Sequence, residues 1–152
     1  MDATDIKIKR IHNWLISTIQ YEKDENSKNQ HNIYGALHDK KAVCEGYARS
    51  FKYIMKKVGV PAVLVSGTAR NSEDKTESHA WNYVQINENW YAVDVTWDDP
   101  IITEERPLSI EEKYRYCLKG SDEFFKDHTE DGMISENGMK FKYPTLSKSN
   151  YE

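Results

Sequence analysis

The sequence is short of cysteine, glycine and proline and has no long apolar run. Its 152 residues include two cysteines, seven glycines and four prolines. Two cysteines cannot build a disulfide framework, and Cys44 and Cys117 lack the close spacing of a metal-binding pair. A membrane helix needs about 20 consecutive apolar residues, which this chain does not have, so we expect no membrane span. With these classes excluded, we expect an ordinary folded domain.

Neither basic nor acidic side chains strongly predominate in the chain. It carries 21 basic and 25 acidic side chains, for a formal net charge of −4. This balance gives no support for nucleic-acid binding, because nucleic-acid-binding domains present basic patches. The start, Met1 to Asp5, lacks the basic and apolar regions of a secretory signal. A cytoplasmic protein and a domain cut from a longer exported chain both remain open, and so does the oligomeric state.

The length suits one domain over residues 1–152, with a core over about 6–130. Apolar residues at helical spacing predict a helix from residue 4 to about 20, with Thr4 or Asp5 as its N-cap. A second helix is predicted from Cys44 to Val58, ended by Gly59. We expect the polar segments 22–32 and 71–78 to be loops.

Branched and aromatic residues predict strands in the second half of the chain. We expect Ser121 to cap a short helix that carries Phe124 and Phe125. Helices followed by mostly antiparallel strands indicate an α+β fold, with the N-terminal helices packed on the sheet. The predicted strands are 62–66, 79–86, 90–96 and 114–118. Beyond Gly132 we expect irregular structure or a short strand near 139–143.

Cys44 lies where an extended segment turns into the second helix, within Ala42–Ala48. A helix N-terminus carries partial positive charge, which favours a thiolate over the neutral thiol. The backbone N–H of Cys44 is also a candidate donor to a developing oxyanion. For the second donor, Trp14, Asn13 and Tyr34 remain open.

His79 and Asp94 supply the other groups of a thiol nucleophile site, a base and the residue that orients it. Side chains alternate along a strand, so hairpin register decides whether these two can meet. A two-residue loop at Asn87-Glu88 pairs Ile86 with Asn89 and places His79 and Asp94 on one face as diagonal neighbours. A three-residue loop would place them on opposite faces.

Each of these residues also has a plain structural interpretation. A single helical cysteine is often a small buried apolar residue, and a single histidine is often a hydrogen-bonded core residue. Cys44, His79 and Asp94 are also zinc ligand types, but no further cysteine or close histidine pair supports a metal site, so we expect no metal. His12, His31, His38 and His128 are interpreted as structural or exposed.

Candidate walls of the site are Trp14, Tyr34, Gly46, Trp81 and Trp97. Core packing explains the tryptophans equally well. We interpret Asn82 as structural, Cys117 as a buried strand thiol, and Asp98-Asp99-Pro100 as a turn that ends a strand.

Three motifs together resemble the microbial transglutaminase-like domain over about residues 6–130. They are Gly35-Ala36-Leu37 leading into Ala42–Ala48, then His79–Asn82, then Trp90–Pro100. The resemblance implies a papain-like fold, in which the nucleophile opens a helix packed on an antiparallel sheet. It implies Cys44 as nucleophile, His79 as base and Asp94 as orienter.

The resemblance further implies acyl transfer or hydrolysis through a thioester on protein or peptide amides, without a cofactor. Alternatives within the family are a cysteine protease of the same fold and a catalytically silent scaffold. The chain has His12-Asn13 where similar domains have His-Asp, and Cys117 where they have an aromatic residue. It has no EF-hand spacing, although animal cross-linking members use calcium.

Overall fold

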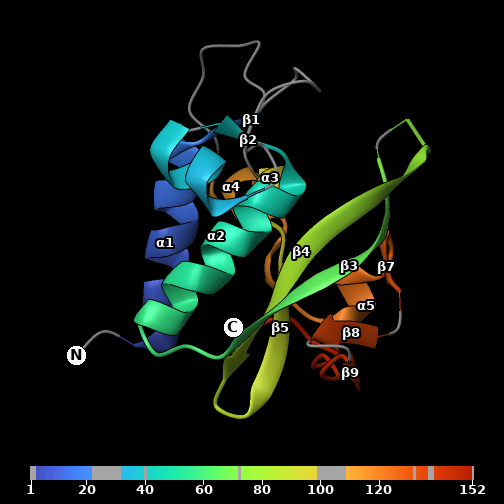
Figure 1. The fold of residues 1–152 in the computed structure, drawn as a ribbon. Helices are drawn as coiled ribbons and strands as arrows, with labels where there is room; N and C mark the ends of the chain where they lie inside the picture. Colours follow the sequence, from blue (N-terminus) through green and yellow to red (C-terminus); the bar gives the residue numbers. More distant parts are fainter. Residues whose placement is uncertain are drawn as a thin grey trace.

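The computed structural model describes residues 3–21, 32–39, 41–71, 73–98, 109–131, 133–136 and 139–151. Its centre is a five-stranded antiparallel sheet (Figure 1) with strand order β6-β5-β4-β3-β7. These strands are β3 (Ala62–Arg70), β4 (Thr76–Ile86), β5 (Asn89–Val93), β6 (Cys117–Lys119) and β7 (His128–Glu130).

Two long helices, α1 (Thr4–Thr18) and α2 (Cys44–Lys57), lie together on one side of the sheet (Figure 1). Their packing on the sheet confirms the expected α+β fold, with N-terminal helices on an antiparallel sheet. Within the described residues, no helix is both long and apolar enough to cross a membrane. The shorter elements are β1 (Gln20–Tyr21), η1 (Gly35–Asp39), β2 (Lys41–Ala42), α3 (Val95–Asp98), α4 (Ile110–Lys113), α5 (Ser121–Phe124), β8 (Met133–Glu136) and β9 (Met139–Lys142).

Each face of the sheet is covered by its own apolar cluster. The first cluster joins α1 and α2 to the sheet and includes Ile8, Phe51 and Val84. The second lies on the face beside α5 and includes Trp81 and Phe124. Burial of apolar side chains on both faces stabilises the sheet between the two layers.

Strand β4 shows how the two faces alternate. Val84 and Ile86 belong to the helix-side cluster, whereas Trp81 and Tyr83 belong to the other. Because successive side chains point to opposite faces, His79 shares the face of Trp81 and Tyr83. The strand therefore delivers His79 to one defined side of the sheet.

Helix α2 begins at Cys44, as predicted, and ends at Lys57. Gly59 has φ +79°, a left-handed conformation that glycine adopts without strain and that ends the helix. Asn82 donates from Nδ2 to the carbonyl oxygens of Ala48, 3.0 Å, and Val63, 3.1 Å. Its predicted structural role is confirmed, since it fastens α2 to the sheet.

Several predicted boundaries were wrong. The loop at 71–78 is shorter, because β3 continues to Arg70 and β4 begins at Thr76. Asn71 Oδ1 accepts from the backbone N–H groups of Glu73 and Lys75, so the side chain supports a tight turn between long strands. Strand β5 ends at Val93 rather than at residue 96 and leads into α3.

Both predicted N-caps were also wrong. Ala3 and Gly120 occupy the N-cap positions of α1 and α5, and neither cap involves a side-chain hydrogen bond. Strand β6 starts at Cys117 instead of residue 114, and Cys117 is a buried thiol as predicted. Of the two alternatives for residues 139–143, the structure has the short strand, β9, which pairs with β8. Most of the predicted loop at 22–32 lies outside the described residues.

Candidate active site

Cys44 is the first residue of α2. Val43 before it is extended, with φ −99° and ψ −179°, and has no side-chain acceptor that could cap the helix. The unpaired N–H groups of a first helical turn favour a nearby negative charge. The Cys44 thiol is free and half-buried, and Gly46 beside it is buried. Glu45 forms an ion pair with Arg49 at 2.8 Å, which accounts for its charge.

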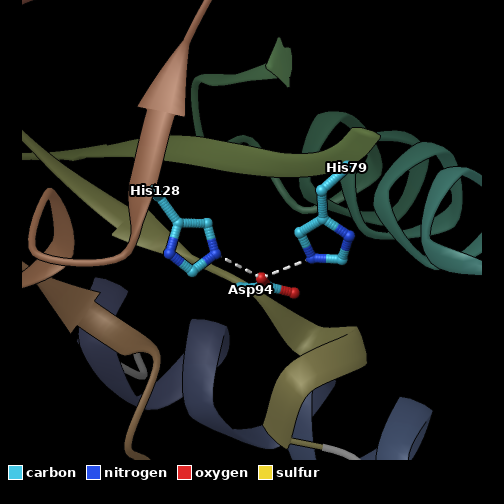
Figure 2. Close-up of side chains that lie close together, drawn as sticks. All are labelled: His79, Asp94 and His128. Carbon is cyan, nitrogen blue, oxygen red and sulfur yellow. Dashed lines mark hydrogen bonds and ion pairs between the residues drawn. The ribbon is translucent and has the colours of Figure 1, made fainter. Parts of the chain in front are cut away.

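The β4–β5 hairpin brings His79 to Asp94. Ile86 pairs with Asn89, and Asn87 and Glu88 have φ values of +50° and +72°, as a two-residue turn with two left-handed residues requires. The predicted even loop is confirmed. His79 Nε2 lies 2.7 Å from Asp94 Oδ2 (Figure 2), and both side chains are buried.

The side chain of Cys44, at the start of α2, contributes to the pKa of His79. Burial lowers the pKa of His79, but the charge of Asp94 and its hydrogen bond act in the opposite direction. A hydrogen bond with Cys44 and the charge of the sulfur add to them, and the pKa of His79 is raised to about 10. Because Nε2 faces Asp94, Nδ1 is the ring nitrogen that remains for the sulfur.

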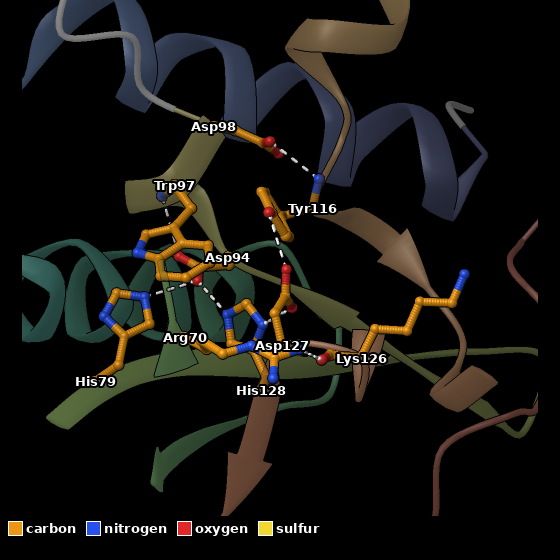
Figure 3. A network of polar contacts seen from close by, with 9 residues as sticks. All are labelled: Arg70, His79, Asp94, Trp97, Asp98, Tyr116, Lys126, Asp127 and His128. Atoms are coloured by element: carbon orange, nitrogen blue, oxygen red, sulfur yellow. Dashed lines mark hydrogen bonds and ion pairs between the residues drawn. The ribbon is translucent and has the colours of Figure 1, made fainter. Parts of the chain in front are cut away.

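Asp94 is held as an anion in a buried site. Burial raises the pKa of its carboxyl, but His79 and His128 outweigh this effect and lower the pKa well below the ordinary value. Asp94 Oδ1 accepts the backbone N–H of Trp97 at 3.2 Å. With Oδ2 bonded to imidazole, both carboxylate oxygens have donors (Figure 3).

His128 is a partner of Asp94 that sequence analysis did not place in the site. Its Nε2 lies 2.7 Å from the same Asp94 Oδ2, and its Nδ1 lies 2.6 Å from Asp127 Oδ1. From the sequence, His128 was interpreted as structural or exposed. The structure shows that it is buried and has two carboxylate partners. The local sequence offers the buried Phe124 four residues before it, which gives no indication of a pairing with Asp94.

The predicted wall residues separate into two groups. The rings of Trp81 and Trp97 have centroids 5.9 Å and 5.2 Å from that of His79, so both lie beside the imidazole. Trp14 and Tyr34 are 45% and 53% exposed, and their assignment to the site stays a prediction. Asn13 Nδ2 donates to the hydroxyl of Tyr114 at 2.8 Å, which occupies one of its two N–H groups.

A second buried histidine–carboxylate pair lies beside the first. His12 Nε2 on α1 is 2.8 Å from Asp98 Oδ2, and Asp98 Oδ1 accepts the backbone N–H of Tyr116. Burial raises the pKa of Asp98 to about 6, although the hydrogen bond and charge of His12 lower it. Asp98 was predicted to end a strand, but it ends α3 and is buried; the other two residues of the predicted turn, Asp99 and Pro100, lie outside the described residues.

His79, Asp94 and His128 are also possible metal ligands, with ligand atoms within 4.8 Å of one another. Donor atoms of a tetrahedral zinc site with bonds of 2.0–2.1 Å lie about 3.4 Å apart. Here each imidazole nitrogen lies 2.7 Å from one shared oxygen, which is hydrogen-bond length. The arrangement is that of a hydrogen-bonded carboxylate.

Comparisons with known proteins identify the family of the chain. The family model of the transglutaminase-like superfamily matches residues 2–95, more than half of the chain. Kyphoscoliosis peptidase of Mus musculus is 25% identical over 136 residues, which cover 82% of this chain and 21% of that protein. The chain thus spans about a fifth of the length of this curated relative.

Two solved structures share the fold. A crystal structure of a TGase has a TM-score of 0.56 at 19% identity, covering 76% of this chain and 31% of that one. The NAT3 arylamine N-acetyltransferase of Bacillus cereus, described as having a Cys-His-Glu catalytic triad, has a TM-score of 0.51 at 19% identity. That match covers 64% of this chain and 44% of the other. On the family match and the fold, the chain belongs to the transglutaminase-like superfamily.

Proposed function

We propose that the chain is a thiol enzyme that transfers or hydrolyses acyl groups of protein or peptide amides through a thioester on Cys44. The observation that carries this proposal is the buried contact of 2.7 Å between His79 Nε2 and Asp94 Oδ2, and Cys44 contributes to the raised pKa of the same imidazole. Family membership supports it, because it brings the three positions within one matched domain.

In the first step the sulfur of Cys44 attacks the amide carbonyl carbon as a thiolate. The proton held by His79 passes to the leaving nitrogen, the C–N bond breaks, and ammonia or an amine departs. A thioester remains on Cys44. His79, now neutral, accepts a proton from water or from an incoming amine as that nucleophile attacks the thioester, and the thiolate is released.

Each residue has a distinct part in this cycle. Asp94 holds the ring of His79 by Nε2 and stabilises its protonated form. The N–H of Cys44 at the start of α2 is our candidate donor to the oxyanion of the tetrahedral intermediate. Trp81 and Trp97 shield the imidazole from water, which strengthens its interaction with Asp94.

The acceptor divides the proposal into two branches. Transfer to a lysine-type amine gives an isopeptide or amine adduct, and transfer to water gives deamidation of glutamine or cleavage of a peptide bond. A curated relative is named a peptidase, which favours hydrolysis as the second candidate activity. The substrates and acceptors of this chain belong to the proposal.

The test is mass spectrometry of a mixed peptide pool incubated with the protein and a primary amine. We expect amine adducts, deamidated glutamines or new peptide termini with the wild type, and none of these with Cys44→Ala. New termini alone would assign a protease, and adducts or deamidation would assign a transglutaminase-type activity. Peptide binding without any product would support the scaffold alternative and reject the proposed enzyme.

A further inference from the structure

His128 enters the site from the far edge of the sheet. It opens β7, where its backbone pairs with Ala69 of β3, and its side chain is buried. Figure 2 shows its ring on the opposite side of Asp94 from His79, with both rings directed at one carboxylate oxygen. Asp94 therefore has a histidine partner on each side.

Hydrogen-bond chemistry fixes which atoms carry protons. An ionised carboxylate only accepts, so Nε2 of His79 and Nε2 of His128 must both donate to Asp94 Oδ2. Nδ1 of His128 faces Asp127 Oδ1 at 2.6 Å and must donate as well if Asp127 is ionised. The contact with Asp94 thus requires a proton on Nε2 of His128.

Aromatic rings enclose His128. The ring of Phe124 stacks on it with centroids 3.9 Å apart, and the centroids of Trp97, Trp81 and Tyr116 lie 4.8, 4.9 and 5.6 Å away. Aromatic rings on several sides restrict how the ring of His128 can turn.

The other polar groups near His128 are few among the described residues. The centroid of the His79 ring is 5.8 Å away, and the hydroxyl of Tyr116 donates to Asp127 Oδ2 at 3.0 Å (Figure 3). The chain of contacts His79–Asp94–His128–Asp127–Tyr116 is continuous, so His128 is held from both sides.

We propose that His128 is a positioning residue of the active site, which holds Asp94 in the orientation that serves His79. The inference rests on the proposed role of His79 as the base. With Oδ2 fixed by His128 and Oδ1 by the N–H of Trp97, the carboxylate of Asp94 cannot rotate away from His79. The effect on Cys44 is transmitted through Asp94, since His128 is bonded to Asp94 and not to the sulfur.

Two substitutions separate positioning from packing. His128→Phe keeps an aromatic ring in the cage but has no N–H for Asp94. His128→Gln loses the ring, but its side-chain amide can place an N–H where Nε2 was. If His128 positions Asp94, the phenylalanine variant is impaired and the glutamine variant recovers much of the loss. If His128 only fills space, the order is reversed.

The readout is the rate at which iodoacetamide labels Cys44 at pH 6, measured on folded protein by mass spectrometry. We expect labelling of His128→Phe to be at least about tenfold slower than labelling of the wild type, because Asp94 would no longer be held in place to orient His79. His12→Phe is the matched control, because it removes the N–H from an equally buried histidine–carboxylate pair in which the acceptor is Asp98 rather than Asp94. Wild-type rates in the phenylalanine variant, or no gain with glutamine over phenylalanine, would overturn the proposal.

A measurement on the wild type decides the case where the phenylalanine variant does not fold. ¹⁵N NMR of the imidazoles should show His128 Nε2 protonated at pH 7, and an unprotonated Nε2 would overturn the proposal. A wild type whose Cys44 labels no faster than denatured protein would instead reject the proposed function. The two failures are therefore distinguishable.

Discussion

His79 Nε2 lies 2.7 Å from Asp94 Oδ2, although 15 positions of sequence separate the two residues. The hairpin makes this contact short in space because its loop has two residues and preserves the parity of the two strands. The contact is buried, so its electrostatic consequences are large and measurable.

The first prediction concerns the protonation of His79. In the wild type its pKa is about 10, because Asp94 and Cys44 outweigh the effect of burial. Asp94→Asn removes the main opposing charge, and the pKa of His79 should fall by several units. Histidine NMR titration measures both values. A pKa that stays near 10 in the variant would show that Asp94 is not the cause.

The second prediction is the pH dependence of stability that follows from that raised pKa. The stabilisation from protonated His79 is complete below about pH 6.5 and is lost as pH rises toward 10, because the folded state alone keeps the proton in that interval. Urea unfolding should show the wild-type free energy of unfolding falling more steeply between pH 6.5 and 10 than that of Asp94→Asn. Parallel curves for the two proteins would contradict this.

The third prediction separates the second histidine pair from the chemistry. His12→Phe leaves the buried carboxyl of Asp98 without the N–H of its imidazole partner and should lower the free energy of unfolding by about 1–3 kcal/mol. Urea unfolding tests this loss. Labelling of Cys44 in the folded fraction should match the wild type, and a large drop there would mean that His12 belongs to the active site.

The fourth prediction concerns Gly67, which pairs with His79 on one side and with Glu130 of β7 on the other. A Cβ at this position would collide with the backbone carbonyl of Thr129 and press on the ring of Trp81. Gly67→Ala should therefore displace β7 and destabilise the protein by about 1–3 kcal/mol. Unfolding curves and the NMR signals of the His128 ring provide the check, and unchanged values in both would show that the strands can adjust.

Local patterns were sufficient to predict the parts of the site that depend on few residues. The N-terminus of α2 follows from the extended segment before Cys44, and the meeting of His79 and Asp94 follows from the loop at Asn87-Glu88. The pairing of β7 with β3 joins segments about 60 residues apart, and nothing in the residues near His128 indicates the partner strand. His128 was missed for this reason.

Asp98 was misinterpreted for a different reason. Asp98-Asp99-Pro100 has the composition of a turn, and turn propensity is a local preference. The burial of Asp98 instead comes from its contact with His12 of α1, which joins residues 86 positions apart. Sequence periodicity carries no information on a single polar contact of that range.

The central claim is that the thiol of Cys44 is activated by His79, and the most direct test is the rate of its labelling by iodoacetamide at pH 6. An ordinary thiol with a pKa near 8.5 is less than about 1% thiolate at that pH. We predict that folded wild type labels at Cys44 at least about tenfold faster than the same cysteine in urea, and that His79→Ala loses this advantage. Equal rates in folded and denatured wild type, or full reactivity in His79→Ala, would contradict the account.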